Sequence, residues 1–167
     1  MIAWWMIILA LPVGTALLFC MDEPTRIFAR RFAPWVSVPP VAMAIFWPAE
    51  QFADASWFMF GGAFGLDASG QFLMLLTSVA WAIASFYARR YTADDPKKDR
   101  FWLFFLLTMA GNLGLIGAFT IGSFYLFFAL MTFSAFGLVV HDETTTAHFA
   151  ARVYITMAIL GEALLLV

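Results

Sequence analysis

The sequence has few charged residues: they make up 12% of the chain, whereas 63% of its residues are hydrophobic. A soluble domain usually has about a quarter of its residues charged and about half apolar. The composition therefore excludes an ordinary soluble domain and indicates a membrane protein. Residues 2–21, 101–118 and 124–140 contain no Asp, Glu, Lys, Arg or His. Each stretch is long enough to cross a bilayer core of about 30 Å as an α-helix.

Cysteine and metal-binding patterns are also scarce. The single cysteine, Cys20, excludes an internal disulfide and a thiolate metal site. The sequence has no Gly-rich phosphate-binding loop, no basic tail and no cluster of metal ligands. We therefore expect no cofactor, no metal and no nucleic-acid partner, and we predict that the chain is not an enzyme by itself.

Lys and Arg are missing before the first apolar segment, whereas a secretory signal peptide has them there. The first segment is therefore expected to be a membrane span. Nearly all the basic residues fall in two loops, which carry Arg26, Arg30 and Arg31, and then Arg89, Arg90, Lys97, Lys98 and Arg100. Because basic loops remain in the cytoplasm, this distribution predicts a bacterial inner (cytoplasmic) membrane protein with its N-terminus outward.

These patterns predict an all-α membrane protein of about six transmembrane helices. The spans are expected at about residues 2–21, 32–48, 70–90, 101–118, 121–140 and 148–167. The second span contains Pro39 and Pro40, which remove two backbone donors and should kink or break the helix. Residues 57–60 and 63–66 are predicted to be two strands around Gly61-Gly62, in a small outward-facing β-hairpin within residues 52–67.

Small and amide side chains recur at helical spacing in two spans. They are Gly111, Asn112 and Gly114 in the fourth span, and Ala158 and Gly161 in the sixth. Because small residues let helix backbones approach closely, we expect these positions to pack helices together, with Asn112 hydrogen-bonded to a neighbour. Asp67 precedes the third span and is expected to cap that helix rather than to handle ions.

Several segments occur in a characteristic order and spacing along nearly the whole chain. They are Phe64-Gly65-Leu66-Asp67, residues 101–117, residues 124–132, Leu138-Val139-Val140-His141 and Ala150-Ala151-Arg152-Val153-Tyr154. Together they resemble the antiporter-like subunits shared by respiratory complex I, membrane-bound hydrogenases and multisubunit cation/proton antiporters.

The resemblance implies a truncated version of that family's architecture. Family members are longer and contain two inverted repeats, each with a broken helix that carries a lysine. This chain resembles only the opening third, so we expect one transmembrane domain over residues 1–167, with leading helices in 1–90 and a partial repeat in 101–167. At Ala129 the family has a glutamate that pairs with that lysine. The resemblance thus implies that this chain alone cannot perform the family's proton-transfer step.

Four ionisable residues are candidates for an ion pathway. Glu162, inside the sixth span, is either a proton-carrying or partner-pairing carboxylate or, as we favour, a group near the outer end of the helix within reach of water. Arg152 either pairs with a carboxylate of another subunit or, as we favour, contacts a lipid phosphate. His141 and His148 either feed protons into a channel or, as we favour, belong to an ordinary cytoplasmic loop.

The sequence therefore predicts an accessory or split antiporter-like subunit of a multisubunit proton- or cation-translocating membrane complex. Its partners are expected to be other integral membrane subunits, complex I-like or antiporter-like, and the lipid bilayer, and the chain is not expected to be a monomer. The alternative is a purely structural or assembly subunit without ion conduction.

Overall fold

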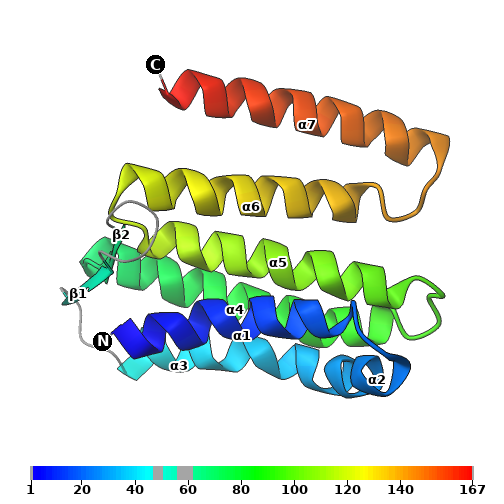
Figure 1. Cartoon of the computed structure of the whole chain (residues 1–167), viewed down its shortest axis with the longest axis horizontal. Helices are drawn as coiled ribbons and strands as arrows, with labels where there is room; N and C mark the ends of the chain where they lie inside the picture. The colour runs from blue at the N-terminus through cyan, green and yellow to red at the C-terminus, as the bar shows by residue number, and fades with distance from the viewer. Residues whose placement is uncertain (1, 47–50, 56–61, 167) are drawn as a thin grey trace.

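The structure is a computed structural model that describes residues 2–46, 51–55 and 62–166. Figure 1 shows the long helices lying side by side, with α7 forming an outer layer next to α6. In chain order the elements are α1 (Ile2–Leu18), α2 (Glu23–Phe32), the 3-10 helix η1 (Ala33–Ser37), α3 (Val38–Phe46), β1 (Gln51–Ala55), β2 (Gly62–Leu66), α4 (Ala68–Tyr91), α5 (Lys98–Gly117), α6 (Ile121–Val139) and α7 (Thr145–Leu166).

Four helices of the described part are long and apolar enough to cross a membrane, namely Ala68–Tyr91, Lys98–Gly117, Ile121–Val139 and Thr145–Leu165. A shorter apolar helix, Trp4–Leu18, accompanies them. Helices suit a bilayer because they satisfy their backbone donors and acceptors internally. The predicted fold, an all-α multi-pass membrane protein with one small β-hairpin, is confirmed.

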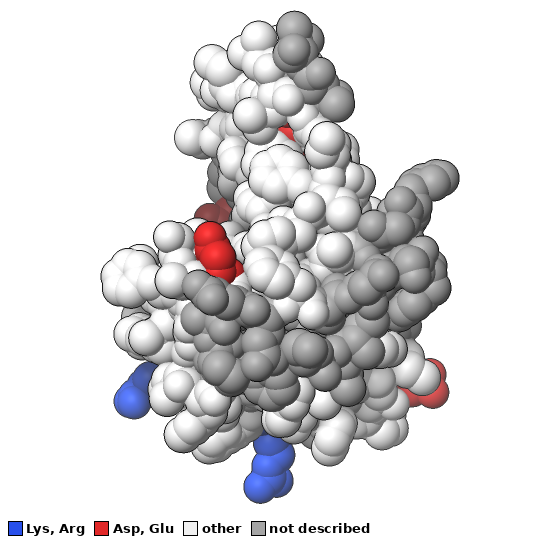
Figure 2. All heavy atoms as spheres, turned by 90° about the vertical axis from the view of Figure 1, so that its left-hand side faces the viewer, with Lys and Arg blue, Asp and Glu red and all other residues white. Residues whose placement is uncertain are grey.

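The bundle has two chemically different ends. The N-terminus, the hairpin, the α5–α6 turn and the C-terminus lie at one end, here called the hairpin end (Figure 1). Helix α2 and the α4–α5 and α6–α7 loops lie at the other, here called the basic end, because Lys and Arg cluster there. Figure 2 views the hairpin end, where few charged side chains interrupt the described surface.

Helix α5 lies at the centre, packed against α1, α4 and α6. Leu106, Met109 and Leu113 on this helix are completely buried. Its glycines bring α6 close, since a Cβ at Gly111 would lie 2.5 Å from the backbone nitrogen of Met131. In lipid, where apolar side chains gain little by leaving the solvent, such close packing is what stabilises helix association.

The second predicted span is divided rather than continuous. Its residues form η1 and then α3, and residues 47 and 48 lie outside the described part. The cause is the proline pair. Pro39 has no N–H to donate to the carbonyl of Trp35, which instead accepts from the nearer N–H of Val38. The predicted break at Pro39 and Pro40 is confirmed.

Helix α2 was not predicted, because residues 22–31 were interpreted as a basic loop. It runs across the basic end of the bundle (Figure 1). Pro24 near its start is compatible with a first helical turn. Its buried contact is made by Ala29, whereas Ile27 and Phe28 are 58% and 61% exposed. An amphipathic helix with exposed apolar groups beside arginines is typical of the membrane–water interface.

The hairpin pairs different residues from those predicted. Strands β1 and β2 are antiparallel, with Gln51 opposite Leu66 and Ala55 opposite Gly62. The first predicted strand, 57–60, and Gly61 lie outside the described residues, and the partner of β2 is residues 51–55. The prediction rests on the aromatic run at 57–60, which has high β propensity, and it misses the less aromatic segment 51–55 that pairs.

The bundle itself covers part of the hairpin. Phe64 is buried, with its ring centroid 5.6 Å from that of Trp5 and 5.8 Å from that of Phe127. The amide of Phe119 donates to the carbonyl of Ala63 at 2.9 Å, so the α5–α6 turn is bonded to the hairpin. Aromatic packing and this hydrogen bond therefore fix β2 on the helices.

Asp67 caps α4, as predicted. Its backbone is extended, and its Oδ1 accepts from the N–H of Gly70 at 2.6 Å. The first helical amides lack partners within the helix, so a side-chain acceptor here stabilises the helix start.

Candidate functional site

Glu162 lies near the C-terminal end of α7 and is half-buried. Its Oε1 atom is shielded from solvent, and no donor of the described residues lies within hydrogen-bonding distance. A carboxylate without a donor in apolar surroundings is unfavourable, so such a group either binds a proton or acquires a partner.

Arg152 lies ten residues before Glu162 on the same helix, which corresponds to about 15 Å along the axis. The two side chains therefore cannot form an ion pair. Arg152 is exposed, and no carboxylate of the described residues pairs with it. Its carbonyl accepts from the hydroxyl of Thr156 at 2.7 Å, a bond within the helix that leaves the guanidinium free.

His141 is joined to the α4–α5 loop rather than to its sequence neighbours. Its Nε2 lies 2.6 Å from Oδ2 of Asp95, and its ring packs edge-on against Phe101. This hydrogen bond, together with one from the backbone N–H of Lys97, holds the pKa of Asp95 below its ordinary value. The Nδ1 atom of His141 is buried and has no hydrogen-bond partner among the described residues.

His148 lies in the first turn of α7 and is exposed. No hydrogen bond or ion pair in the described part connects its side chain to His141 or to a carboxylate. The two histidines predicted together thus have separate environments. The described residues also contain no group of three His, Cys, Asp or Glu side chains that could hold a metal ion.

Glu143 ties two loops of the basic end together. Its carboxylate forms ion pairs with Lys97 and Arg100, which hold its pKa down at about 2. Arg100 also donates to the carbonyls of Val140 and His141, both at 3.3 Å. The α4–α5 loop therefore binds another loop of its own chain.

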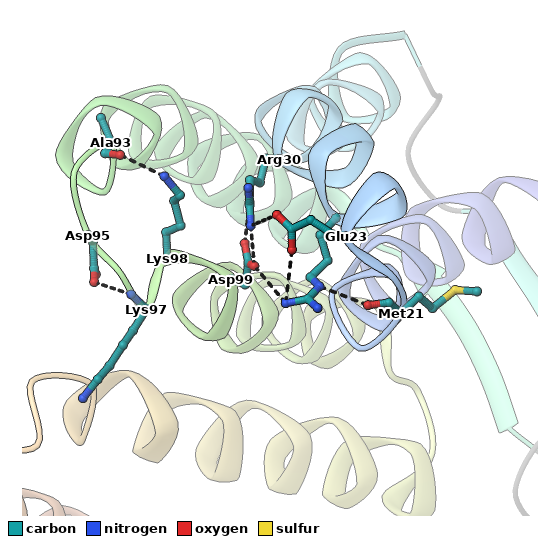
Figure 3. Close-up of polar contacts among 9 residues, drawn as sticks. Met21, Glu23, Arg30, Ala93, Asp95, Lys97, Lys98 and Asp99 are labelled. Atoms are coloured by element: carbon teal, nitrogen blue, oxygen red, sulfur yellow. Dashed lines mark hydrogen bonds and ion pairs between the residues drawn. The ribbon is translucent and has the colours of Figure 1, made fainter.

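A second network joins α2 to α5 (Figure 3). The guanidinium of Arg30 donates two hydrogen bonds of 2.6 Å to the carboxylate of Asp99, and Glu23 accepts from the same guanidinium at 3.2 Å. Paired bonds of this geometry are strong and directional. Sequence reasoning missed this contact, although the spacing of Glu23, Arg26 and Arg30 fits one face of a helix.

The predicted packing residues fall into two groups. Gly111 and Gly114 lie against α6, where a Cβ at Gly114 would come 2.3 Å from the ring of Phe127. Asn112 accepts from Trp81 Nε1 of α4 at 3.0 Å and donates to Met131 of α6 at 3.5 Å. On α7, by contrast, a Cβ at Gly161 would meet nothing within 4 Å. Ala158 on α7 and Ala129 on α6 are half-buried.

The sequence matches no protein-family model and no curated protein. Among solved structures, the fold is similar to a chain of the membrane-bound sulfane sulfur reductase, an archaeal respiratory membrane complex, with a TM-score of 0.65. The likeness is one of fold. Sequence identity is 16%, and the superposition covers 95% of this chain and 34% of that chain. The chain thus spans about a third of the length of its structural relative.

Helix α7, which carries Glu162, is the least covered of the membrane-spanning helices in the described part. In its apolar stretch only 6% of the residues are buried, compared with 56% in the apolar stretch of α5. Figure 2 shows α7 as an upper lobe standing above the body. Glu162 therefore lies on the helix that has the least cover from its own chain.

Proposed function

We propose that the chain is an accessory or split antiporter-like subunit of a multisubunit proton- or cation-translocating membrane complex. In this proposal it packs against another integral membrane subunit, which completes the ion pathway, and is not catalytic by itself. The observation that carries the proposal is Glu162: a carboxylate oxygen shielded from solvent, without a donor in the described part, on the least covered membrane-spanning helix.

Lipid alone is a poor cover for this part of α7. Acyl chains offer no hydrogen-bond donor, and ionisable residues inside membranes usually face protein or a water-filled cavity and belong to ion paths. A partner helix that brings a donor or a cation to Glu162 would satisfy it. In this arrangement Glu162 exchanges a proton or pairs with that cation, and Ala129 leaves the α6 position without a charge.

The resemblance and the structural comparison support the same proposal. The sequence resembles the opening third of longer antiporter-like subunits. The structurally similar chain belongs to a respiratory membrane complex, and the superposition covers 34% of that chain. We infer that residues 1–167 form one transmembrane domain, which packs against the part of the module that completes the ion pathway. The antiporter-like family is thus proposed on fold and motif order together.

The proposed orientation follows from the charges. The basic end faces the cytoplasm of a bacterial cell, and the N-terminus and the hairpin face outward, because loops rich in Lys and Arg are retained inside. His141 and His148 then lie on the cytoplasmic side, and Arg152 lies at a depth where it can contact lipid phosphate.

A second candidate is a structural subunit that assembles the complex without conducting ions. It is favoured by the pairing of charges at the basic end: Glu143 is bound by Lys97 and Arg100, and Asp99 by Arg30. Groups held in this way serve to connect helices and loops.

The substitution Glu162→Gln distinguishes the two functions. The complete complex is purified with the variant chain and reconstituted in liposomes, and proton flux is measured beside subunit composition. An ion-path role predicts flux lower by about tenfold or more with assembly intact. Asp94→Asn, in the exposed α4–α5 loop, serves as the matched control and should leave flux unchanged. Unchanged flux with Glu162→Gln would overturn the ion-path role and favour the structural subunit.

A further inference from the structure

The basic end contains a pocket of about 460 Å³ where α2, the end of α4 and the start of α5 meet. Four cationic side chains line it, from all three of these helices, and Ile27 and Trp102 add apolar surface. The cations are Arg30, Arg31, Arg89 and Lys98. No carboxylate is among the described residues that line the pocket. A concave site with this lining selects an anion.

Most of this positive charge is not compensated within the described chain. Arg30 is paired with Asp99 and Glu23 (Figure 3). Arg31, Arg89 and Lys98, in contrast, have no carboxylate within ion-pair distance among the described residues. The ammonium of Lys98 donates to the carbonyl of Ala93 at 3.0 Å, which leaves its charge unneutralised. Three cations around one pocket repel each other unless an anion lies between them.

The depth of the pocket indicates where that anion comes from. Arg89 lies in the last turn of the membrane-spanning helix α4, and Lys98 is the first residue of the membrane-spanning helix α5. The pocket is therefore at the level where a bilayer's headgroups meet its hydrocarbon. Tyr87 and Tyr91 on α4 are exposed with stacked rings, as is typical of aromatic side chains at this interface.

The rim of the pocket is suited to acyl chains. Ile27 on α2 is exposed beside the pocket, and Phe28 and Phe32 of the same helix stack on each other at its outer surface. A small inorganic anion would use the cations alone. A lipid would use the cations for its phosphate and these apolar side chains for the start of its chains.

We propose that this pocket binds the phosphate group of an anionic phospholipid. Arginine matches phosphate geometry with paired N–H donors, so Arg31 and Arg89 are assigned as the principal phosphate ligands and Lys98 as a supporting point charge. The bound lipid joins α2 to α4 and α5 and neutralises their mutual repulsion. This site is independent of Glu162, which lies near the opposite end of the bundle.

The test uses the chain purified in its membrane complex, stripped of lipid with detergent, and titrated with phosphatidylglycerol while bound lipids are counted by native mass spectrometry. The double variant R31Q/R89Q should weaken phosphatidylglycerol binding by roughly 25-fold, since each basic group near an anionic surface contributes about fivefold. R90Q is the matched control. Arg90 neighbours Arg89, is exposed, lacks a carboxylate partner in the described part and does not line the pocket, so binding should be unchanged.

Two further arms, both on the wild-type complex, identify the ligand class. Phosphatidylcholine, which carries no net charge, should bind at least tenfold more weakly than phosphatidylglycerol. Inorganic phosphate at millimolar concentration should not displace bound phosphatidylglycerol. The proposal is overturned if R31Q/R89Q binds phosphatidylglycerol like the wild type, if R90Q loses as much affinity, or if phosphatidylcholine binds equally well. Displacement by inorganic phosphate would overturn the lipid assignment in favour of a free-anion site.

Discussion

Helices α5 and α7 are similar in length and hydropathy, but they have opposite roles in the fold. In the apolar stretch of α5, 56% of the residues are buried within the chain, whereas in the apolar stretch of α7 only 6% are buried. Both contain glycines, yet Gly111 and Gly114 touch α6 whereas Gly161 faces open space. Apolar character thus places both helices in a membrane, and only the tertiary contacts distinguish a helix packed by its own chain from one left to lipid or a partner.

The largest expected loss of stability comes from replacing a glycine at the contact between α5 and α6. Gly111→Leu should destabilise the chain by about 3 kcal/mol or more, because its side chain would overlap the backbone of Met131, which cannot move aside. Gly161→Leu should change the stability of the chain alone by less than about 0.5 kcal/mol. Unfolding in mixed micelles of increasing dodecyl sulfate, followed by tryptophan fluorescence, measures both. Equal destabilisation by the two variants would contradict the assignment of α7 as the uncovered helix.

A smaller effect is expected at the hydrogen bonds that connect α5 to its neighbours. Asn112→Leu removes the acceptor of Trp81 Nε1 and the contact with Met131. The loss should be about 1–2 kcal/mol, the upper range for interhelical bonds in membranes. Thr156→Val on α7 is the matched control, since its hydroxyl bonds only within its own helix, to the carbonyl of Arg152. The same unfolding assay applies, and a loss at Thr156 as large as at Asn112 would remove the distinction.

The third prediction is that replacing Glu162 affects the isolated chain and the complex differently. Glu162→Leu should leave the isolated chain as stable as before or stabilise it by about 1 kcal/mol, because it removes a shielded polar group without a donor. In the complex the same variant should weaken retention of the partner subunit. Unfolding of the chain alone and co-purification of the partner are the two measurements. Marked destabilisation of the isolated chain would show that Glu162 is satisfied internally.

The smallest effect is expected from pH at the loops that join α4 to α5 and α6 to α7. The pKa of Glu143 is depressed from 4.5 to about 2, and that of Asp95 is also lowered. Groups with depressed pKa values stabilise the folded state fully above their unfolded values and lose this contribution as pH falls toward the folded ones. The stability difference between wild type and Glu143→Gln should therefore be constant above about pH 5 and shrink as pH approaches 2. A stability difference that grows on acidification would contradict the ion pairs of Glu143. Because these ion pairs are exposed, we expect their contribution to stability to be modest.

Much of the helical fold could be predicted because burial in lipid leaves a clear local signal. Apolar runs marked α1, α4, α5, α6 and α7, proline chemistry located the break before α3, and Asp67 identified the start of α4. Each depends on a residue's own chemistry and its near neighbours in sequence. The proposed orientation in the membrane rests on the same kind of local signal, since loop charge alternates with span number.

The contacts that were missed all depend on pairing between distant segments. Residues 51–55 form β1 because they meet β2 and the end of the bundle, although residues 57–60 have the stronger aromatic composition. The pairs His141–Asp95 and Arg30–Asp99 join residues far apart in the chain, which composition and spacing within one segment do not reveal. The placement of Glu162 is similar, because its lack of a donor is a property of everything around it.

The divided second span has a consequence for the surrounding bilayer. Together η1 and α3 rise only about 23 Å, well short of a hydrocarbon core of about 30 Å, and they expose Trp35, Ile45 and Phe46 at their outer surface. Along the described part of this edge we therefore expect hydrophobic mismatch. Lipids there must thin or tilt, at a cost of a fraction of a kcal/mol per Å, so this edge should collect shorter acyl chains and favour contact with another equally thin protein surface.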